Sequence, residues 1–455
     1  MPLVSINPTT GRLIRRYRAI STGQMNAAVL RADAAFLEWR RLSFAARARL
    51  VRAAAIALRR RRDDHAQLIT IEMGKPLSQA RSEVEKCAVA CDYFAQHAAR
   101  FLAPERPPGA PKNGRVTFQP LGVLLAVMPW NFPFWQAFRA AAPALMAGNT
   151  VLLKHASNVC GCALAIESVF REAGLPGGVF QTLLVGADRV PALISHPKVK
   201  AVTLTGSMEA GRRVAALAGA ALKKTVLELG GSDPYVILED ADLDVAAEAC
   251  AQGRLINTGQ SCIAAKRMIV VDSVRAEFER RFVARMAARK AGPPTEPGAD
   301  LGPLARSDLR DALDAQVRQS VRRGARLLLG GKPLPGPGWF YPATVLTDVH
   351  PGMPAHDEEL FGPVAAIVPV RDEAAALAAA NDSAYGLAAA VFTRNRSHGR
   401  RVAVEDLDAG VVFVNDYVRS DPSLPFGGVR QSGYGRELGP FGIREFVNIK
   451  TVVVA

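Results

Sequence analysis

The stretch LGVLLAVMPWNFPFWQAFRAAAPALMAG (residues 121–148) is the most apolar run of the chain, and its interpretation decides the fold. Its length alone would suit a membrane span. However, it contains three prolines together with Asn131 and Arg139, and such residues are costly in lipid. The pattern therefore predicts a buried strand, then a turn at PWNFP, then a helix, and no membrane insertion.

The same alternation of short apolar strands and helical sequence continues along the chain. Further strand-like segments follow as TVLLK, FQTLLV, AVTLT and TVLELG, and after Glu228 as YVIL, RMIVV, VAAIVPV and GVVFVN. Strands that alternate with helices indicate βαβ units and mostly parallel sheets. The sequence thus predicts the α/β fold class, with two open α/β units in succession.

The region before this stretch has a different pattern. Helical, Ala- and Arg-rich sequence begins at STGQ (21–24), which is typical of a capping box. Cys87 and Cys91 lie on an apolar stripe at helical spacing, which indicates core packing. The Pro- and Gly-rich segment 102–114 interrupts the helices. The last residues, NIKTVVVA, predict a strand that completes a sheet elsewhere, with a partner subunit as one candidate.

Length and charge narrow the classes of protein. A chain of 455 residues is long enough for two or more domains. The net charge of +15 raises the possibility of a nucleic-acid-binding protein. Yet the arginines are scattered over helical segments, and aromatic residues make up only 7% of the chain. We therefore expect a solvated Arg-rich surface and no nucleic-acid partner.

The cysteine content and the N-terminus bear on the compartment. Six cysteines show no disulfide framework and no zinc spacing, so we expect no metal. The N-terminal MPLVSINPTTGRL lacks the apolar region of a signal peptide. These features favour a reducing cytoplasm.

Three stretches carry candidate catalytic residues. In NTGQSCIAAKR, Cys262 stands among small residues. It could be a buried thiol that fills space, or a nucleophile that a ligand can approach. Glu228 ends an apolar strand before two glycines, as either a cap or a general base. Asn131 lies between two prolines that stiffen its turn, as either a turn cap or a donor to an oxyanion.

The glycine-rich signal of a dinucleotide site is absent in its usual form. Instead, the strand AVTLT is followed by GSMEAG, which begins at Gly206. Ser207 and the first free N–H groups of the next helix could hold a phosphate. A strand–helix turn without any ligand explains the pattern equally well.

Taken together, these stretches resemble the aldehyde dehydrogenase superfamily over essentially the whole chain. The motifs occur in the family's order: PWNFP, LLKHAS, TLTGS, LELGGSDP, NTGQSCIAAKR, EELFGPV, LPFGG and SGYGRELG. Within the superfamily the chain is most similar to the short bacterial succinate-semialdehyde dehydrogenases. The resemblance implies oxidation of an aldehyde to a carboxylic acid, here succinate semialdehyde to succinate, through a cysteine thiohemiacetal and thioester.

The resemblance also implies an architecture of two Rossmann-like domains and a small β arm. Residues 1–101 and 121–228 would form the cofactor-binding domain, and residues 229–435 the catalytic domain. Residues 102–120 and 436–455 would form an oligomerisation arm, because family members are usually homodimers or homotetramers.

Residue roles follow from the matched motifs. Cys262 stands at the nucleophile position, Glu228 at the general-base position, and Asn131 at the oxyanion donor, together with the backbone N–H of Cys262. The positions that match cofactor contacts are Trp130, Gly206, Ser207, the Leu229 backbone, Glu359 at the nicotinamide ribose, and Phe361 beside it.

Two further pairs concern selectivity. In the family the lysine at Lys154 reaches the adenosine ribose. Since Ser157 is neutral and leaves room for a 2′-phosphate, we expect NADP⁺ to be preferred over NAD⁺; a neutral site that uses both is the alternative. The resemblance places Arg139 and Ser420 at the substrate carboxylate. From the sequence alone, Arg139 could equally be paired with a structural acid.

Three other functions compete with this interpretation. A broad-specificity dehydrogenase of aliphatic or aromatic aldehydes would share the same catalytic residues. A CoA-acylating relative is disfavoured by Glu228, because transfer to CoA needs no water-activating acid. A nucleic-acid-binding protein would need clustered cations interleaved with stacking aromatics, which the sequence lacks.

Overall fold

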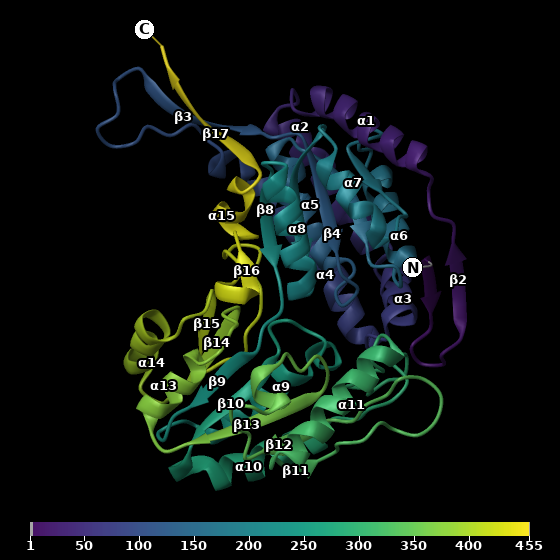
Figure 1. Ribbon diagram of the computed structural model, residues 1–455. Helices are drawn as coiled ribbons and strands as arrows, with labels where there is room; N and C mark the ends of the chain where they lie inside the picture. The colour runs from purple at the N-terminus through teal and green to yellow at the C-terminus, as the bar shows by residue number, and fades with distance from the viewer. Residues whose placement is uncertain (1–2, 455) are drawn as a thin grey trace.

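The structure, a computed structural model, describes residues 3–454. It contains two large sheets, one in the upper and one in the lower half of Figure 1, and two small two-stranded sheets. This arrangement confirms the predicted α/β fold class. The decisive apolar stretch forms β4 (Val123–Met128) and the fully buried helix α5 (Trp135–Ala147), with PWNFP between them.

The first large sheet has six strands in the order β16-β8-β7-β4-β5-β6. Neighbouring strands are parallel except for β16, which is antiparallel to β8. The other strands are β5 (Thr150–His155), β6 (Phe180–Thr182), β7 (Val199–Thr205), β8 (Lys224–Glu228) and β16 (Gly433–Tyr434). Because the carboxyl ends of the parallel strands share one edge, that edge is where a ligand is expected to bind.

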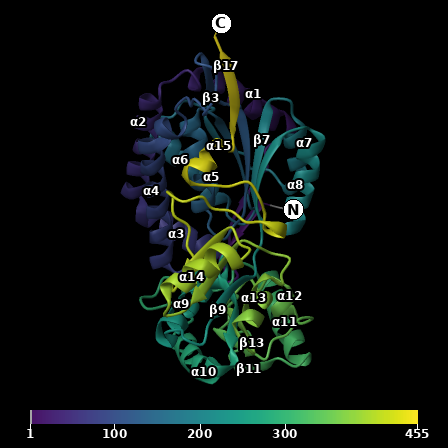
Figure 2. The ribbon, with the colours of Figure 1, turned by 90° about the vertical axis from the view of Figure 1, so that its left-hand side faces the viewer.

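Helices cover both faces of this sheet, as Figure 2 shows with α2 and α4 on one side and α7 and α8 on the other. Leu124 and Ala126 of β4 belong to one core cluster, whereas Val123 and Leu125 belong to another. The strand is therefore buried on both faces, which explains its unbroken apolar sequence. The helices are α1 (Thr22–Trp39), α2 (Phe44–Arg60), α3 (Arg62–Met73), α4 (Leu77–Phe101), α6 (Cys160–Glu172), α7 (Val190–Ser195) and α8 (Met208–Ala220).

Two local predictions for the N-terminal helices are confirmed. Ser21 Oγ accepts a hydrogen bond from Gln24 N at 3.2 Å, and Gln24 Oε1 accepts one from Ser21 N at 2.9 Å. These two bonds form the predicted capping box of α1. Cys87 and Cys91 of α4 are fully buried in the core.

The second large sheet has seven strands in the order β11-β12-β13-β10-β9-β14-β15. Only β11 is antiparallel to its neighbour. The strands are β9 (Asp233–Ile237), β10 (Ala265–Val271), β11 (Arg326–Leu329), β12 (Thr344–Thr347), β13 (Val364–Val370), β14 (Ala388–Phe392) and β15 (Val411–Val414). Its helices are α9 (Leu243–Leu255), α10 (Asp272–Ala287), α11 (Ser307–Arg322), α12 (Pro354–Asp357), α13 (Glu373–Asn381) and α14 (Arg396–Arg401).

The chain returns to the first unit after β15. Helix α15 (Gly439–Arg444) packs against α4 and α5, and β17 (Val447–Val453) pairs antiparallel with β3 (Gly114–Pro120). The predicted terminal strand thus pairs within its own chain. Figure 1 shows the β3–β17 ladder projecting from the body, and Ile449 and Val453 on it are 61% and 58% exposed.

Membrane-spanning helices and metal clusters are both absent from the described residues. None of their helices is both long and apolar enough to cross a membrane. Among residues 3–454, no cluster of three or more His, Cys, Asp or Glu side chains is arranged to hold a metal ion.

A buried carboxylate ties the N-terminal hairpin of β1 (Leu3–Ile6) and β2 (Leu13–Tyr17) to the first unit. Glu72 of α3 accepts hydrogen bonds from Gly161 N and Cys162 N of α6 at 3.0 and 2.9 Å. It also accepts from Ser5 Oγ of β1 and, at 3.4 Å, from Tyr17 OH of β2. A negative charge at the N-terminus of α6 is favourable in itself.

We predict that Glu72→Gln lowers the stability of the fold by about 1–3 kcal/mol, because an amide nitrogen cannot accept from the buried N–H groups of α6. The measurement is the midpoint of thermal unfolding. The matched control is Glu38→Gln, which removes an exposed pair with Arg41 and should change stability by less than about 1 kcal/mol. Equal midpoints for both variants would contradict the role given to Glu72.

Candidate active site

Eight of the thirteen predicted site residues line one cavity at the carboxyl edge of the first sheet. The five that do not line it are Glu228, Arg139, Lys154, Ser157 and Ser420. The structure brings together residues that follow β4, β7 and β8 with two loops of the second unit, which precede β10 and β13. The predicted residues that line the cavity are Trp130, Asn131, Gly206, Ser207, Leu229, Cys262, Glu359 and Phe361. Catalytic and cofactor-type residues therefore share one space between the two units.

The loop before Cys262 has an unusual backbone. Asn257, Thr258 and Gly259 have φ values of 55°, 57° and 73°, so three successive residues are left-handed. Such conformations cost free energy at non-glycine residues and persist only where the surroundings impose them. Here Thr258 Oγ1 accepts from Gly302 N at 2.9 Å. A Cβ on Gly259 would lie 2.2 Å from the carbonyl oxygen of Gly362. The loop thus fixes where Cys262 emerges.

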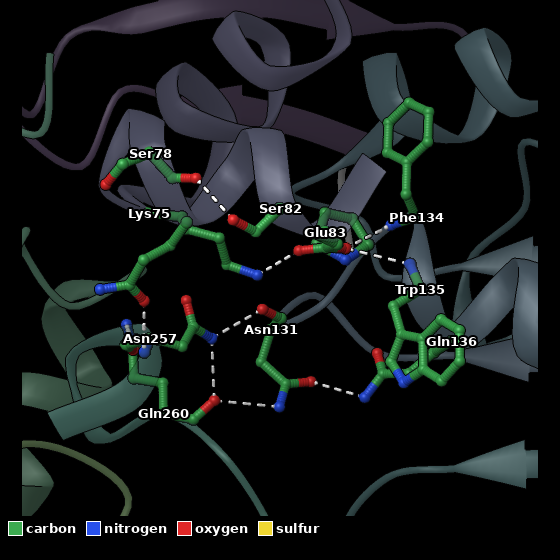
Figure 3. A network of polar contacts seen from close by, with 12 residues as sticks. Lys75, Ser78, Ser82, Glu83, Asn131, Phe134, Trp135, Gln136, Asn257 and Gln260 are labelled. Atoms are coloured by element: carbon green, nitrogen blue, oxygen red, sulfur yellow. Dashed lines mark hydrogen bonds and ion pairs between the residues drawn. The ribbon is translucent and has the colours of Figure 1, made fainter. Parts of the chain in front are cut away.

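Asn131 is held by a polar network that links the PWNFP turn to this loop (Figure 3). Its Nδ2 donates to Gln260 O at 3.1 Å, and its Oδ1 accepts from Gln136 Nε2 at 3.0 Å. Asn257 Nδ2 donates to the carbonyls of Asn131 and Gln260 at 2.7 and 3.0 Å. Because an amide nitrogen carries two hydrogens, one hydrogen of Asn131 Nδ2 stays available for a ligand.

Glu83 of α4 fixes the other end of the turn. Its carboxylate accepts from Phe134 N and Trp135 N at 2.9 and 3.0 Å, where α5 begins, and it is paired with Lys75 (Figure 3). Lys75 Nζ also lies 3.8 Å from the ring centroid of Phe132. These buried contacts pre-organise the segment that carries Asn131.

Cys262 is a partly exposed free thiol. Burial raises its pKa to about 12, although the charges of Arg139 and Lys266 oppose the rise. In the described part of the chain, the backbone N–H of Cys262 has no hydrogen-bond acceptor. The sulfur therefore lies beside a free donor, and it needs a proton acceptor or an added positive charge to become a nucleophile.

Glu228 ends β8 and is buried. Neither carboxylate oxygen has a hydrogen-bond partner among the described residues. Burial, and then the charge of Glu437, raise its pKa well above the usual value of a carboxyl group. A Cβ on Gly427 would lie 2.6 Å from Glu228 Oε1, so the glycine of LPFGG leaves space for this carboxylate. An unpartnered carboxyl group of raised pKa suits a general base.

Arg139 of α5 has an acidic partner in the structure. Its guanidinium is buried, forms an ion pair with Glu437 and donates to Thr205 Oγ1 at 3.1 Å. It also lies over the ring of Phe426, 5.0 Å from the centroid. The structural acid that the sequence left open as its partner is therefore Glu437, since a buried arginine requires a counter-charge.

Ser420 does not share these partners. Its Oγ accepts a hydrogen bond from Lys86 Nζ at 2.7 Å. The expectation that Arg139 and Ser420 bind the substrate carboxylate stays a prediction; in the structure Arg139 is paired with Glu437, and Ser420 accepts from Lys86.

The residues matched to cofactor contacts line the same cavity, and they come from both α/β units. The rings of Trp130 and Phe361 meet edge to face at 5.7 Å. Glu359 Oε1 accepts from Gly231 N at 3.1 Å and lies 3.5 Å from Lys266 Nζ. The N–H of Leu229 donates to a main-chain carbonyl at 2.9 Å, so only its carbonyl and side chain are available to a ligand.

Two further groups of predicted cofactor-binding residues lie at strand ends: Gly206 and Ser207 after β7, and Lys154 and Ser157 at the end of β5. Ser207 caps α8 by accepting from Ala210 N at 3.3 Å, and Gly206 precedes it. Lys154 of β5 is 9% exposed and has no hydrogen-bond or carboxylate partner in residues 3–454. Burial lowers its pKa. Ser157, three residues on, is half-buried and uncharged. A buried unpaired cation with no competing acid beside it fits an anionic ligand.

Four residues that shape the site were not predicted from the sequence: Gln136, Lys266, Glu437 and Lys86. Glu437 lies within SGYGRELG and Lys266 within NTGQSCIAAKR, so their proximity to the nucleophile offered a signal. Lys86 gave none, because it stands in an ordinary amphipathic helix far from every motif.

Comparisons with known proteins agree with this geometry. The model of the aldehyde dehydrogenase family matches residues 2–452. The chain is 49% identical to a succinate-semialdehyde dehydrogenase [NADP(+)] of Mycobacterium tuberculosis, over 100% of both chains. It is 48% identical to the succinate semialdehyde dehydrogenase [NAD(P)+] Sad of Escherichia coli, over 99% of this chain and 97% of that one.

Solved structures give the same result. Succinic semialdehyde dehydrogenase from Streptococcus pyogenes, in complex with NADP⁺, is 35% identical and aligns with a TM-score of 0.96 over 99% of both chains. On the family match and on this full-length identity, the chain belongs to the aldehyde dehydrogenase family.

Proposed function

We propose that the protein oxidises succinate semialdehyde to succinate, with NADP⁺ as the preferred cofactor. The observation that carries the chemistry is one cavity lined by Cys262, Asn131 and the residues matched to cofactor contacts, with the buried Glu228 next in sequence to its lining residue Leu229. The substrate is supported by the names of the full-length relatives.

In this mechanism Cys262 and Asn131 act on the carbonyl group. The Cys262 thiol releases its proton to solvent, Sγ bonds to the aldehyde carbon, and the electron pair of the carbonyl π bond moves to the oxygen, which becomes an oxyanion. The free hydrogen of Asn131 Nδ2 and the free N–H of Cys262 donate to that oxyanion. A bound nicotinamide dinucleotide supplies the acceptor of the hydride that leaves this carbon. A thioester then remains on Cys262.

Glu228 acts in the second half of the cycle. Its carboxylate takes a proton from a water molecule, which attacks the thioester and releases the acid. Because Glu228 has no protein partner to hold it, its carboxylate can serve as a base when ionised. Transfer of the acyl group to water, and not to CoA, follows from this residue.

A second buried carboxyl group, Glu437, affects Glu228. Burial, and then the charge of Glu437, raise the pKa of Glu228, whereas burial raises the pKa of Glu437, and the positive charge of Arg139 opposes both rises. We assign Arg139 a positioning role through Glu437. Its positive charge also opposes the rise in the pKa of Cys262, and its role at the substrate carboxylate, with Ser420, stays a prediction.

Lys154 and Ser157 carry the proposed preference for NADP⁺. An unpaired buried lysine can bind a 2′-phosphate, and the neutral serine leaves the phosphate unopposed. Neither residue requires the phosphate, so NAD⁺ remains a second cofactor. No metal is involved in this scheme.

We further propose the roles of the larger parts. Residues 1–101 and 121–228 bind the cofactor, residues 229–435 carry the nucleophile, and residues 102–120 with 436–455 contact a second copy in a homodimer or homotetramer. The exposed apolar side chains of β17 support the last assignment. Six free thiols support a cytoplasmic location.

We predict that Cys262→Ala abolishes aldehyde-dependent reduction of NADP⁺, because Cys262 is the one thiol among the described residues that line the cavity. The control Cys91→Ala, in the buried core of α4, should keep turnover. Both are measured by absorbance of the reduced cofactor. Wild-type turnover in Cys262→Ala would show that the nucleophile is assigned to the wrong residue.

We predict that Glu228→Gln forms one equivalent of reduced cofactor rapidly and then stalls, since the thioester loses its water-activating base. In the wild type, the base is active only when ionised, so turnover should fall as the pH drops through the raised pKa of Glu228. Rapid-mixing kinetics across pH check both points. A variant that keeps steady-state turnover and the same acid limb would contradict this role.

We predict that Ser157→Glu shifts the ratio of kcat/KM toward NAD⁺ by about tenfold or more, because a carboxylate repels a 2′-phosphate and accepts from ribose hydroxyls. Ser157→Gln, of similar size and without charge, is the control. Equal ratios in wild type and Ser157→Glu would remove Ser157 from the selectivity argument.

A further inference from the structure

Lys266, the second residue of β10, places a buried ammonium group next to the nucleophile. Its Nζ donates to Cys262 O at 2.7 Å and to Ser261 O at 3.1 Å, and it lies 3.5 Å from Glu359 Oε1. These three oxygens match the three hydrogens of an ammonium group. Among the described residues that line the cavity of Cys262, Lys266 is absent. It can therefore act on a bound substrate only through its neighbours.

The bond to Ser261 O fixes the orientation of one peptide unit. The carbonyl of Ser261 and the N–H of Cys262 belong to the same unit, which is trans, since the described residues contain no cis peptide bond. A trans unit is planar, so its C=O and N–H point in opposite directions. Lys266 thus holds the carbonyl end, and the N–H of Cys262 points away from the ammonium group. In residues 3–454 this N–H has no acceptor.

The two glycines of LELGGSDP leave space for the partners of Lys266. A Cβ on Gly231 would lie 2.8 Å from Cys262 O, and a Cβ on Gly230 would lie 2.5 Å from Glu359 Oε2. Glu359 Oε1 also accepts from Gly231 N at 3.1 Å. Two of the three oxygens around the ammonium group are therefore held in place by close contacts with one short segment.

The charge of Lys266 is costly at this position. Burial lowers its pKa, and the charges of Glu359 and Asp233 oppose the fall. Its positive charge in turn opposes the rise in the pKa of Cys262. A well-packed apolar side chain often stabilises a buried site as well as an ion pair does. The presence of a fully buried cation on the carbonyls beside the nucleophile therefore indicates a role at the site.

We propose that Lys266 is a positioning residue of the oxyanion site, which orients the N–H of Cys262 toward the substrate oxygen by binding the carbonyl groups of Ser261 and Cys262. This inference rests on the proposed function, in which that N–H and Asn131 stabilise the oxyanion. The carboxylate of Glu359 holds the ammonium group on its third side. Lys266 thereby joins the oxyanion donor to the residue matched to the nicotinamide ribose.

The first test replaces the ammonium group by an apolar one. Lys266→Met keeps a long unbranched side chain and removes all three donors. Because a donor to an oxyanion acts mainly in the transition state, we expect kcat for succinate semialdehyde to fall roughly 10- to 100-fold, somewhat less than for loss of a whole donor, with little change in KM. Steady-state kinetics at saturating NADP⁺ give both values. A folded variant with wild-type kcat would overturn the proposal.

Alkylation of Cys262 by iodoacetamide separates positioning from an effect of charge on the thiol. This reaction needs the thiolate but forms no oxyanion. If Lys266 acted only through its charge, kcat and the alkylation rate would fall by the same factor, and the positioning role would be overturned. We expect the alkylation rate to fall much less than kcat. Mass spectrometry identifies the modified peptide, since the other five cysteines are buried.

Arg267→Met is the matched control, because it removes the neighbouring buried cation of the same strand. The guanidinium of Arg267 also donates to main-chain carbonyls, those of Ser232, Ala379 and Ala380, but it does not contact Cys262. We expect wild-type kcat per folded molecule in this variant, whatever its unfolding midpoint. A fall as large as that in Lys266→Met would mean that kcat reports general disruption of β10, and would contradict a specific role of Lys266.

Lys266→Gln is the second variant, which keeps an uncharged donor on a shorter side chain. We expect a smaller loss of kcat than in Lys266→Met, because one carbonyl can still be bound. Equal kcat values in the two folded variants would show that the charge matters and the hydrogen bonds do not, against the proposal. If Lys266→Met does not fold, Lys266→Gln decides alone. A fall in kcat that exceeds the fall in the alkylation rate supports positioning, and an unchanged kcat overturns it.

Failure of the proposed function gives a different result. If the wild type does not oxidise succinate semialdehyde with NADP⁺, or if Cys262→Ala stays active, the proposed function fails, and this inference fails with it. If the wild type is active and depends on Cys262, but Lys266→Met keeps its kcat or loses kcat and alkylation equally, only the role of Lys266 is overturned.

Discussion

The site depends on the hydrogen bonds between the PWNFP turn and the left-handed loop before Cys262. Asn257 donates to the carbonyls of Asn131 and Gln260, and Asn131 donates back to Gln260. One partner belongs to the first α/β unit and the other to the second. Because the oxyanion donor and the nucleophile come from different units, this small network sets their relative position more directly than either core does.

The two reactive groups of the site, Cys262 and Glu228, are affected by burial in the same way. Burial raises the pKa values of both Cys262 and Glu228, so the protein surroundings disfavour the charged form of each group. The arrival of a positive ring or the departure of a proton to a neighbour changes that balance. Reactivity is thereby tied to the presence of ligands.

Much of this could be predicted from the sequence, for identifiable reasons. The β4–α5 stretch was interpretable because burial on both faces removes polar residues from a strand. The catalytic candidates could be found because sequence motifs surround them, and some glycines of these motifs are required by packing. Gly427 leaves room for Glu228, and Gly259 packs against Gly362. The domain assignments and residue roles rest on resemblance and remain predictions.

Other features could not be read from local patterns. The partner of Arg139 is Glu437, almost three hundred residues away along the chain, and nothing near either residue indicates the pair. Lys86 stands in a helix whose spacing shows only which face is apolar. Which cation lacks a counter-charge is a property of the folded surroundings and not of any short segment.

The order of the strands has a consequence for synthesis. The second sheet uses only residues 233–414, a continuous segment. The first sheet receives its last strand from residues 433–434, and β3 meets its partner only at residues 447–453. On the ribosome the inserted unit can therefore close early, while the unit that begins first must wait for the final residues, with its edges open to chaperones until the chain is released.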